Sequence, residues 1–166
     1  MTLSDRLAVM NAGRIVQVGT PGDIYEFPAN RLVGEFIGTI NVFEGTADTA
    51  DGSVHCPALP HPIVLEDRIE AAQGAQVAVG IRPEKLRIRK AGTTGPAPAP
   101  VANFLSGHVE DIAYLGDLSI FHVRLDDGRI VQVSRTNITR RRDEPLTWED
   151  PVEVEWDPQA PVVLHQ

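Results

Sequence analysis

Two short apolar runs separated by turn residues stand near the start of the chain. The runs are Leu7–Met10 and Ile15–Val18, and Asn11, Ala12 and Gly13 lie between them. Two β-prone runs around a short Asn/Gly loop are typical of a β-hairpin. The pattern therefore predicts an antiparallel pair of strands at this end of the chain.

Two short helices are predicted after the hairpin. Thr20 is suited to cap the first helix, Pro21 suits its first helical position, and Pro28 ends it. The second helix is indicated by four apolar residues that share one helical face: Leu32, Val33, Phe36 and Ile37. Gly38 is expected to end this helix in the left-handed conformation.

From Asn41 onward the pattern changes to short apolar strands separated by turn residues. The expected strands are Val42–Gly45, Ala75–Val79, Leu86–Ile88, Gly107–Val109, Ile120–Val123, Ile130–Val133 and Val152–Trp156. Asp-Gly pairs at 51–52 and 127–128 indicate hairpin turns. Many short strands at close spacing predict an all-β barrel or sandwich. Residues 91–100, rich in Pro, Gly and Ala, have no apolar period and are predicted to form an extended or disordered linker.

One hexapeptide occurs twice in the chain. Gly-Arg-Ile-Val-Gln-Val stands at 13–18 and again at 128–133, and the match does not extend on either side. A true repeat would extend further, so we interpret the two copies as similar hairpins rather than as a repeat.

Composition and charge narrow the class of protein. The 166 residues include 15 Lys and Arg against 23 Asp and Glu, which gives a net charge of −8. This balance weighs against a nucleic-acid partner, because affinity for nucleic acid comes mostly from neutralised phosphates. Cys56 is the only cysteine, which excludes an internal disulfide and favours a reducing compartment. No apolar run approaches the ~20 residues of a membrane span, so we expect a soluble, cytoplasmic chain.

The sequence shows no pattern of catalytic or metal-binding residues. Lys85 and Lys90 are the only lysines, and neither follows a glycine-rich phosphate-binding loop. His55, Cys56 and His61 lie close together, but prolines interrupt them and no fourth ligand follows. This spacing favours a solvent-facing loop over a zinc site. We therefore expect no catalytic, cofactor-binding or metal-binding residue in this chain.

Charge is concentrated towards the C-terminal end. A cluster of four arginines stands at 135 and 140–142. It precedes a run of acidic residues: Asp143, Glu144, Glu149, Asp150, Glu153, Glu155 and Asp157. Arginines on an OB-type barrel can bind oligonucleotides, but the adjacent acids would cancel most of their field within a Debye length of about 8 Å. We interpret these residues as a solvated face, with a polar interface to a protein partner as the alternative.

Several motifs resemble those of ABC-transporter ATP-binding subunits. The first group is similar to the end of the nucleotide-binding domain: Ser4–Met10, Gly13–Ile15, Gly19–Pro21, Ile24-Tyr25, Pro28–Asn30 and Phe36–Gly38. The second group is similar to the accessory regulatory domain called TOBE: Ile81–Glu84, Tyr114–Gly116, and Trp156 with Val163-Leu164. Within the family, two motifs look most like the putrescine/polyamine importer ATPases: Asn41–Gly45 and Ile112–Ser119.

The resemblance implies a mostly β fold. Residues 39–166 would form the OB-type TOBE domain, and residues 1–38 would supply a short hairpin and two short helices from the end of the nucleotide-binding domain. The implied function is regulation and dimerisation of the ATP-binding subunit of a polyamine importer. Such a subunit lies on the inner face of the plasma membrane, where it contacts permease subunits and a second copy of itself. The alternative is a sensor of a small ligand, polyamine or oxyanion, that acts without ATPase activity.

The resemblance also places the ATP chemistry of the family outside this chain. The Walker A, signature, Walker B and switch-histidine motifs are missing, so we expect the chain alone neither to bind nor to hydrolyse ATP, whereas the parent protein would use ATP and Mg. Six residues are candidates for regulatory or interface contacts: Arg82, Glu84, Tyr114, Leu115, Gly116 and Asp117. Arg82 and Glu84 would orient the barrels or meet the opposite subunit, with a local ion pair as the alternative. Tyr114, Leu115 and Gly116 would form a turn that shapes the barrel.

Overall fold

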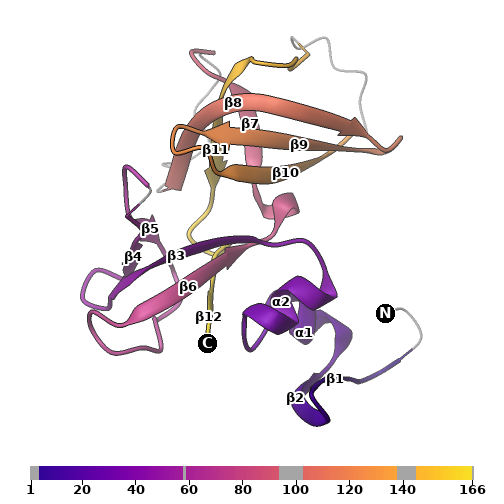
Figure 1. The fold of residues 1–166 in the computed structure, drawn as a ribbon, viewed down its shortest axis with the longest axis vertical. Coiled ribbons are helices and arrows are strands. Elements are labelled where there is room, and N and C mark those ends of the chain that lie inside the picture. Colours follow the sequence, from indigo (N-terminus) through magenta and orange to yellow (C-terminus); the bar gives the residue numbers. More distant parts are fainter. Residues whose placement is uncertain (1–3, 58, 94–102, 138–144, 166) are drawn as a thin grey trace.

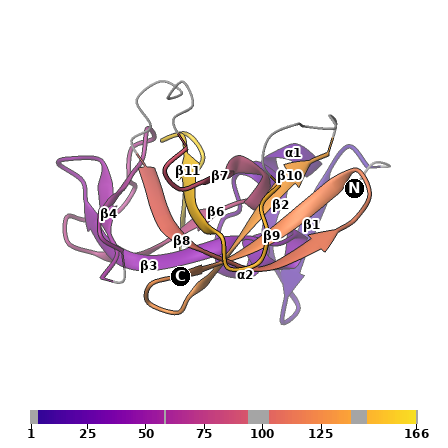
Figure 2. The same cartoon turned by 90° about the horizontal axis from the view of Figure 1, so that it is seen from above.

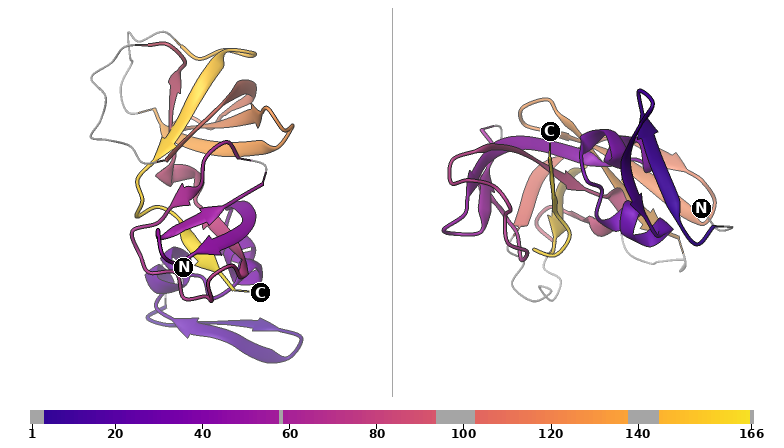
Figure 3. Two further views of the ribbon diagram at one scale, coloured as in Figure 1. Left: turned by 90° about the vertical axis from the view of Figure 1, so that its left-hand side faces the viewer. Right: turned by 90° about the horizontal axis from the view of Figure 1, so that it is seen from below.

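The computed structural model of the chain describes residues 4–57, 59–93, 103–137 and 145–165. Within these residues, two five-stranded sheets and one two-stranded sheet account for the strands. The two larger sheets lie one above the other, and the two-stranded sheet and the helices sit beside and below the lower one (Figure 1). Figure 3 shows the upper sheet, the lower sheet and the hairpin following one another along the long axis. The chain is mostly β, as the strand pattern predicts.

The N-terminal part, which we call the lead-in, is a hairpin followed by two short helices. Strands β1 (Leu7–Asn11) and β2 (Arg14–Gly19) pair antiparallel, and helices α1 (Pro21–Glu26) and α2 (Arg31–Ile37) follow. Seen from above, the lead-in lies at one end of the molecule and strand β4 at the other (Figure 2). The predicted hairpin and both predicted helices are confirmed.

Local side-chain chemistry starts both helices. The Thr20 hydroxyl accepts from the Asp23 amide at 3.2 Å, and the Asp23 carboxylate accepts in return from the Thr20 amide at 3.3 Å, which forms a capping box. The Asn30 side chain caps α2 by accepting from the Val33 amide at 3.0 Å. These two N-terminal caps satisfy amides that have no partner within the helices.

The prediction for the end of α2 is wrong, because the φ of Gly38, 173°, is extended backbone rather than left-handed.

The apolar face predicted for α2 is only partly buried. Val33 is fully buried and packs with Val9 and Ile24 in a small apolar cluster of the lead-in. Leu32 and Phe36 instead remain exposed. The buried face of α2 is therefore narrower than the apolar face that the sequence predicts.

The two larger sheets are built from ten strands. The lower sheet has the order β12-β6-β3-β4-β5, with bounds β3 (Asn41–Asp48), β4 (Ser53–His55), β5 (Ile63–Val64), β6 (Gln76–Ile81) and β12 (Val162–Leu164). The upper sheet has the order β10-β9-β8-β11-β7, with bounds β7 (Arg87–Lys90), β8 (Asn103–Tyr114), β9 (Leu118–Leu125), β10 (Ile130–Thr136) and β11 (Pro151–Trp156). A short 3-10 helix, η1 (Pro83–Lys85), connects β6 to β7. The expected strands are confirmed with shifted bounds, whereas β4, β5 and β12 were not expected.

A single apolar core joins the two larger sheets. Every second residue of β3 and β9 is buried, so each strand turns one face inward. The core includes Phe43 and Val79 from the lower sheet and Phe121, Val154 and Trp156 from the upper one. Each such side chain stabilises the fold by about 1.5–3 kcal/mol when fully buried. The two sheets are therefore held together mainly by apolar burial.

The two copies of the repeated hexapeptide form the second strands of two hairpins, β1-β2 and β9-β10. Their interpretation as similar hairpins is confirmed. Both Asp-Gly pairs form turns in which glycine is left-handed, with φ of 63° at Gly52 and 84° at Gly128. Part of the predicted linker, residues 94–100, lies outside the described residues, as do 140–144 of the charged segment.

A different repeat relates the two larger sheets. Strands β3 and β8 share the pattern Asn-x-apolar-x-Gly, at 41–45 and 103–107. Each pairs antiparallel with a later strand in the same register: Asn41–Ile81 matches Asn103–Trp156, Phe43–Val79 matches Leu105–Val154, and Gly45–Val77 matches Gly107–Val152. The two sheets therefore have the same internal construction.

The last strand of each repeat lies in the sheet of the other. Strand β7 follows β6 in sequence but pairs with β11 of the upper sheet, and β12 follows β11 but pairs with β6 of the lower sheet. We call residues 41–90 half 1 and residues 103–164 half 2. Each half completes the sheet of the other half.

Candidate functional site

Arg82 is the most densely bonded side chain at the junction of the lead-in and the lower sheet. It follows β6 directly, and it is only 4% exposed. Its guanidinium donates hydrogen bonds to the main-chain carbonyl oxygens of four residues: Gly34 at 3.0 Å, Gly38 at 2.9 Å, Thr39 at 3.1 Å and Tyr25 at 3.0 Å. The last carbonyls of a helix have no partner within it. Arg82 therefore caps the C-terminal ends of α1 and α2 with one side chain.

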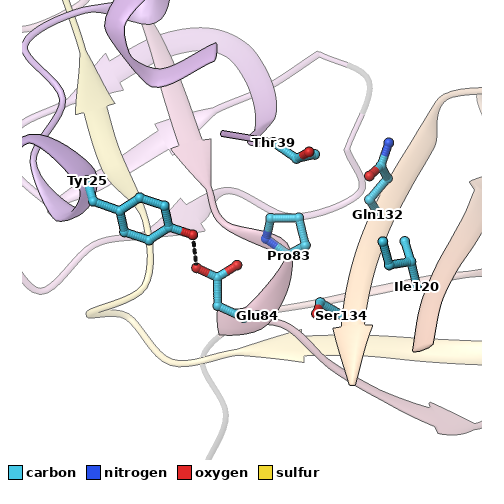
Figure 4. A pocket seen from close by; sticks show the side chains of 7 residues that line it. All are labelled: Tyr25, Thr39, Pro83, Glu84, Ile120, Gln132 and Ser134. Carbon is cyan, nitrogen blue, oxygen red and sulfur yellow. Dashed lines mark hydrogen bonds between the residues drawn. The ribbon is translucent and has the colours of Figure 1, made fainter. Parts of the chain in front are cut away.

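Tyr25 connects Arg82 to Glu84. The guanidinium of Arg82 lies over the Tyr25 ring, 4.2 Å from its centre, and the Tyr25 hydroxyl donates to the Glu84 carboxylate at 2.5 Å (Figure 4). Burial raises the pKa of the Tyr25 hydroxyl to about 12, and the hydrogen bond to Glu84 adds to this shift. The next residue, Lys85, forms an ion pair with Glu26 of α1 at 3.0 Å. We call these five residues the Arg82 joint.

Arg82 and Glu84 do not form with each other the local ion pair that was the alternative expected from the sequence. The hydrogen bonds of Arg82 go to main-chain carbonyls of the lead-in, and the carboxylate of Glu84 accepts from Tyr25 instead. Both side chains thus bind the lead-in. Their expected role at an interface with another subunit stays a prediction.

A small cleft lies beside the joint. It has a volume of about 200 Å³ and is lined by Tyr25, Thr39, Pro83, Glu84, Ile120, Gln132 and Ser134. Figure 4 shows side chains of η1 and the lead-in facing those of β9 and β10 across it. One carboxylate, two aliphatic hydroxyls and an amide make its lining largely polar. The cleft therefore lies between residues of the joint and residues of the upper sheet.

Each of the two larger sheets carries one buried asparagine that binds an outer strand of the other sheet. The Asn41 side chain accepts from the Gln132 amide at 2.8 Å and donates to the Gln132 carbonyl at 2.9 Å. The Asn103 side chain accepts from the Val64 amide at 2.7 Å and donates to the Val64 carbonyl at 3.0 Å. Each amide thus mimics one rung of a strand ladder and satisfies main-chain groups at a sheet edge. The shared Asn-x-apolar-x-Gly pattern is the sequence signal that finds both.

The other four predicted residues form a separate site at the turn between β8 and β9. Tyr114 and Leu115 are 69% and 58% exposed. Gly116 has a φ of 85°, and the Leu115 amide donates to the Leu118 carbonyl at 2.8 Å. The segment is therefore a tight turn, as expected, and it presents two large apolar side chains to solvent.

Asn137 holds this turn from the end of β10. Its amide donates to the Asp117 carbonyl at 2.7 Å, and its side chain donates to the Gly116 carbonyl at 3.0 Å. The Ser119 hydroxyl in turn donates to the Asn137 side chain at 2.9 Å. These bonds hold the backbone of the turn that follows the exposed Tyr114 and Leu115. Asn137 was not singled out from the sequence, because it contacts the turn only through the fold.

Part of the acidic run binds strand β7. Glu155 is 6% exposed and accepts from Arg87 at 3.4 Å, while Arg87 also binds Asp157 at 2.8 Å. Arg89 pairs with Glu153 and lies 3.8 Å from Glu155. The interpretation of this run as a solvated face is therefore wrong for Glu155. The pairing with Arg87 also lowers the pKa of Asp157.

The segment around Cys56 is also less exposed than expected. His55 is the last residue of β4, and Cys56 is buried in the main core. Burial raises the pKa of the Cys56 thiol to about 11. The prediction of a solvent-facing loop is thus wrong at Cys56, although the side chain of His55 is 60% exposed.

These features define the class of protein. The two five-stranded sheets, which together we call the barrel, each receive one strand from the other half, and a helical lead-in is bound to the lower sheet by a buried arginine. Residues 79–164 match the family model described as "TOBE domain", which covers just over half of the chain. The chain belongs to the TOBE-domain family.

The relatives are more specific than the family. The chain is 41% identical, over 99% of its length, to the putrescine transport ATP-binding protein PotG of Escherichia coli K12. It is 34% identical, again over 99%, to the spermidine/putrescine import ATP-binding proteins PotA of Rubrobacter xylanophilus and Thermotoga maritima. The chain spans 43%, 42% and 45% of the lengths of these relatives. The predicted similarity to ATP-binding subunits of polyamine importers is confirmed.

A solved structure supports the fold. The molybdate-binding protein ModG matches with a TM-score of 0.61 at 14% sequence identity, over 76% of this chain and 96% of that one. At this identity the likeness concerns the fold alone. Among the described helices, none has the length and apolar character needed to cross a membrane.

Proposed function

We propose that this chain is the regulatory part of the ATP-binding subunit of an ABC importer for polyamines such as putrescine or spermidine. In the whole subunit, hydrolysis of ATP with Mg would drive uptake through permease subunits at the inner face of the membrane. The similarity to the importer proteins extends over 99% of the chain and so includes the lead-in. The observation that carries the proposal is the Arg82 joint, because it binds the barrel to the lead-in, which resembles the end of a nucleotide-binding domain.

The joint makes the lead-in and the lower sheet move together. Displacing α1 or α2 from the barrel breaks hydrogen bonds between a buried guanidinium and the carbonyls of Tyr25, Gly34 and Gly38. Hydrogen bonds to charged groups contribute about 1.5–3 kcal/mol each. A change in the position of the barrel is thereby transmitted to the lead-in, and a change in the lead-in to the barrel. Such a connection is what a regulatory domain needs.

The turn between β8 and β9 is our candidate for contact with a second copy of the subunit. Tyr114 and Leu115 are exposed beside a turn whose backbone is bonded to Asn137, and aromatic residues are enriched in protein interfaces. A stable interface buries roughly 800 Å² on each partner, so the turn would form one part of a larger contact. Nucleic acid is not an expected partner, given the net charge of −8.

Uptake of labelled putrescine by cells tests the proposal. The whole ATP-binding subunit would carry Arg82→Met, with Arg89→Met in the upper sheet as the matched control. We expect Arg82→Met to lower uptake at least tenfold at equal subunit abundance, and the control to retain it. Unchanged uptake in the Arg82→Met cells would contradict the proposal.

The cleft supports a second candidate function, the sensing of a small cation. Glu84 supplies a carboxylate, and the side chains of Thr39, Gln132 and Ser134 supply further polar groups around about 200 Å³. Calorimetry with putrescine and with spermidine, at low and moderate salt, tests this function. Heat of binding that disappears in Glu84→Gln would support it, and absence of heat under both conditions would remove it.

A further inference from the structure

The two halves of the barrel are equivalent down to a single glycine contact. A Cβ atom on Gly45 would lie 2.5 Å from the carbonyl oxygen of His55 and 2.8 Å from a methyl group of Val54. A Cβ atom on Gly107 would lie 2.6 Å from the carbonyl oxygen of Arg124 and 2.8 Å from the corresponding methyl group of Val123. Together with the common register of β3-β6 and β8-β11, this shows the same packing in both sheets.

Each half binds the other through three kinds of reciprocal contact. Strand β7 of half 1 pairs with β11 of half 2, and β12 of half 2 pairs with β6 of half 1. The side chain of Asn41 binds β10 of half 2, and the side chain of Asn103 binds β5 of half 1. The apolar core joins both sheets. Neither half has a complete sheet or a covered core without the other.

The contacts between β7 and β11 are also complementary in charge. Arg87 and Arg89 of β7 face Glu153, Glu155 and Asp157, which lie on β11 or directly after it. Opposite charges attract whether they belong to one chain or to two. The residues that make these ion pairs lie in β7, in β11 or directly after it, and so outside the connection of residues 91–102.

We propose that each half is a binding surface for the complementary half of a second copy of this chain, so that two copies can form a dimer by exchanging halves. Strand β7 of one copy pairs with β11 of the other, and β12 of the second copy pairs with β6 of the first. Every contact within the barrel is kept in this dimer, which is why exchange of identical elements is an accessible route to dimers. The connection between the halves decides which form is populated.

The distance between the two ends of the connection sets the shortest connection with which both halves of one chain can pair with each other. Lys90 and Asn103 lie on either side of β11, opposite Val152 and Trp156 respectively. Four residues along a strand and two strand spacings separate these ends by roughly 16 Å, from ~3.3 Å per residue and ~4.8 Å per spacing. Residues 91–102 reach this far easily, whereas a connection of two residues spans only about 10 Å. A chain so shortened can complete its sheets only with a second copy.

Deletion of residues 92–101 from the whole chain tests the proposal, with an equal-length Gly/Ser replacement of the same residues as the matched control. The masses of both proteins would be measured by light scattering during gel filtration, and their β content by circular dichroism. We expect the shortened chain to be a folded dimer with about twice the monomer mass. The replacement is expected to keep the oligomeric state of the unaltered chain, because a short tether holds the two halves at millimolar effective concentration. A shortened chain that is a folded monomer would overturn the proposal.

A complementation experiment decides the question if the shortened chain aggregates. Gly45→Val damages half 1 and Gly107→Val damages half 2, while both chains keep the full connection. When the two variants are refolded together, an exchanged dimer contains one barrel with two intact halves. We expect a thermal unfolding transition of about half the normal amplitude in the mixture and of neither variant alone. A mixture no more folded than its components would overturn the proposal, without bearing on the proposed transport function.

Discussion

Replacement of Arg82 by methionine is expected to release the lead-in from the barrel while the sheets stay folded. Methionine keeps much of the buried aliphatic volume, but it cannot donate to the carbonyls of Tyr25, Gly34, Gly38 and Thr39. Hydrogen bonds to a charged group contribute about 1.5–3 kcal/mol each, and a buried carbonyl left without a donor costs about 1–3 kcal/mol. Since water can reach some of the freed carbonyls, we expect a loss of about 3 kcal/mol.

Amide hydrogen exchange measures this loss segment by segment. The reporting amides are those of Ile24 and Phe27 in and after α1 and of Gly34 in α2, which bond within the lead-in. A loss of about 3 kcal/mol corresponds to roughly hundredfold faster exchange through local opening. The amides of β8 and β9 are expected to exchange as before, because their ladder lies in the upper sheet.

Two further variants make this experiment decisive. Arg82→Lys is expected to fall between the unaltered chain and Arg82→Met, because a compact ammonium cannot reach carbonyls of both helices. Arg89→Met is the control, since the Arg89 side chain is 42% exposed and lies in β7. Exchange in α1 and α2 that does not change, or that rises equally in every strand, would refute the reasoning.

Three other predictions follow from buried groups. Gly45→Ala and Gly107→Ala are each expected to lower the free energy of unfolding in urea by about 3 kcal/mol, because the added methyl meets main-chain oxygen; a difference of more than about 1.5 kcal/mol between them would contradict the equivalence of the halves. The folded-state pKa of Tyr25, about 12, lies above its ordinary value of 10.0, so its contribution to stability is present below pH 10 and lost as pH rises through 12. Absorbance titration should show phenolate forming at lower pH in Glu84→Gln. Cys56, with its pKa raised to about 11, is expected to react with a thiol reagent only as fast as the chain unfolds.

Elements specified by neighbouring residues could be predicted from the sequence. Thr20 and Pro21 mark the start of α1 because a capping hydroxyl and a proline act within one turn. The turns at Gly52 and Gly128 follow from two residues each. The longer strands follow from apolar runs. In each case the interactions that decide the structure lie only a few positions apart.

Contacts between distant residues could not be predicted in the same way. Strands β5 and β12 have two and three residues, and they exist because distant strands offer them a partner. Arg82 was a candidate, but its carbonyl partners lie 43 to 57 positions away. The extended backbone of Gly38 belongs to the same contact, because the Gly38 carbonyl accepts from the distant Arg82.

The repeat shared by β3 and β8 could have been found in the sequence by comparing spaced positions instead of contiguous identical residues. The hexapeptide at 13–18 and 128–133 is the longer identical match, yet it reflects only two similar hairpins. The structural repeat retains Asn and Gly at two spaced positions, at 41–45 and 103–107, with different residues between them. Asparagine is kept because its amide must satisfy a strand of the other half, and glycine because a Cβ atom has no space. The spaced Asn and Gly residues, which both have a defined contact in the fold, therefore identify the structural repeat, whereas the contiguous hexapeptide does not.

The most direct test of the proposed regulatory role is the ratio of ATP hydrolysed to putrescine transported by the importer reconstituted in vesicles. The whole ATP-binding subunit would be compared with its Arg82→Met and Arg89→Met variants, each assembled with the permease subunits. If the Arg82 joint connects the barrel to the ATPase, Arg82→Met raises this ratio several-fold while Arg89→Met leaves it unchanged. An unchanged ratio in Arg82→Met, with normal assembly, would contradict a regulatory connection through this joint.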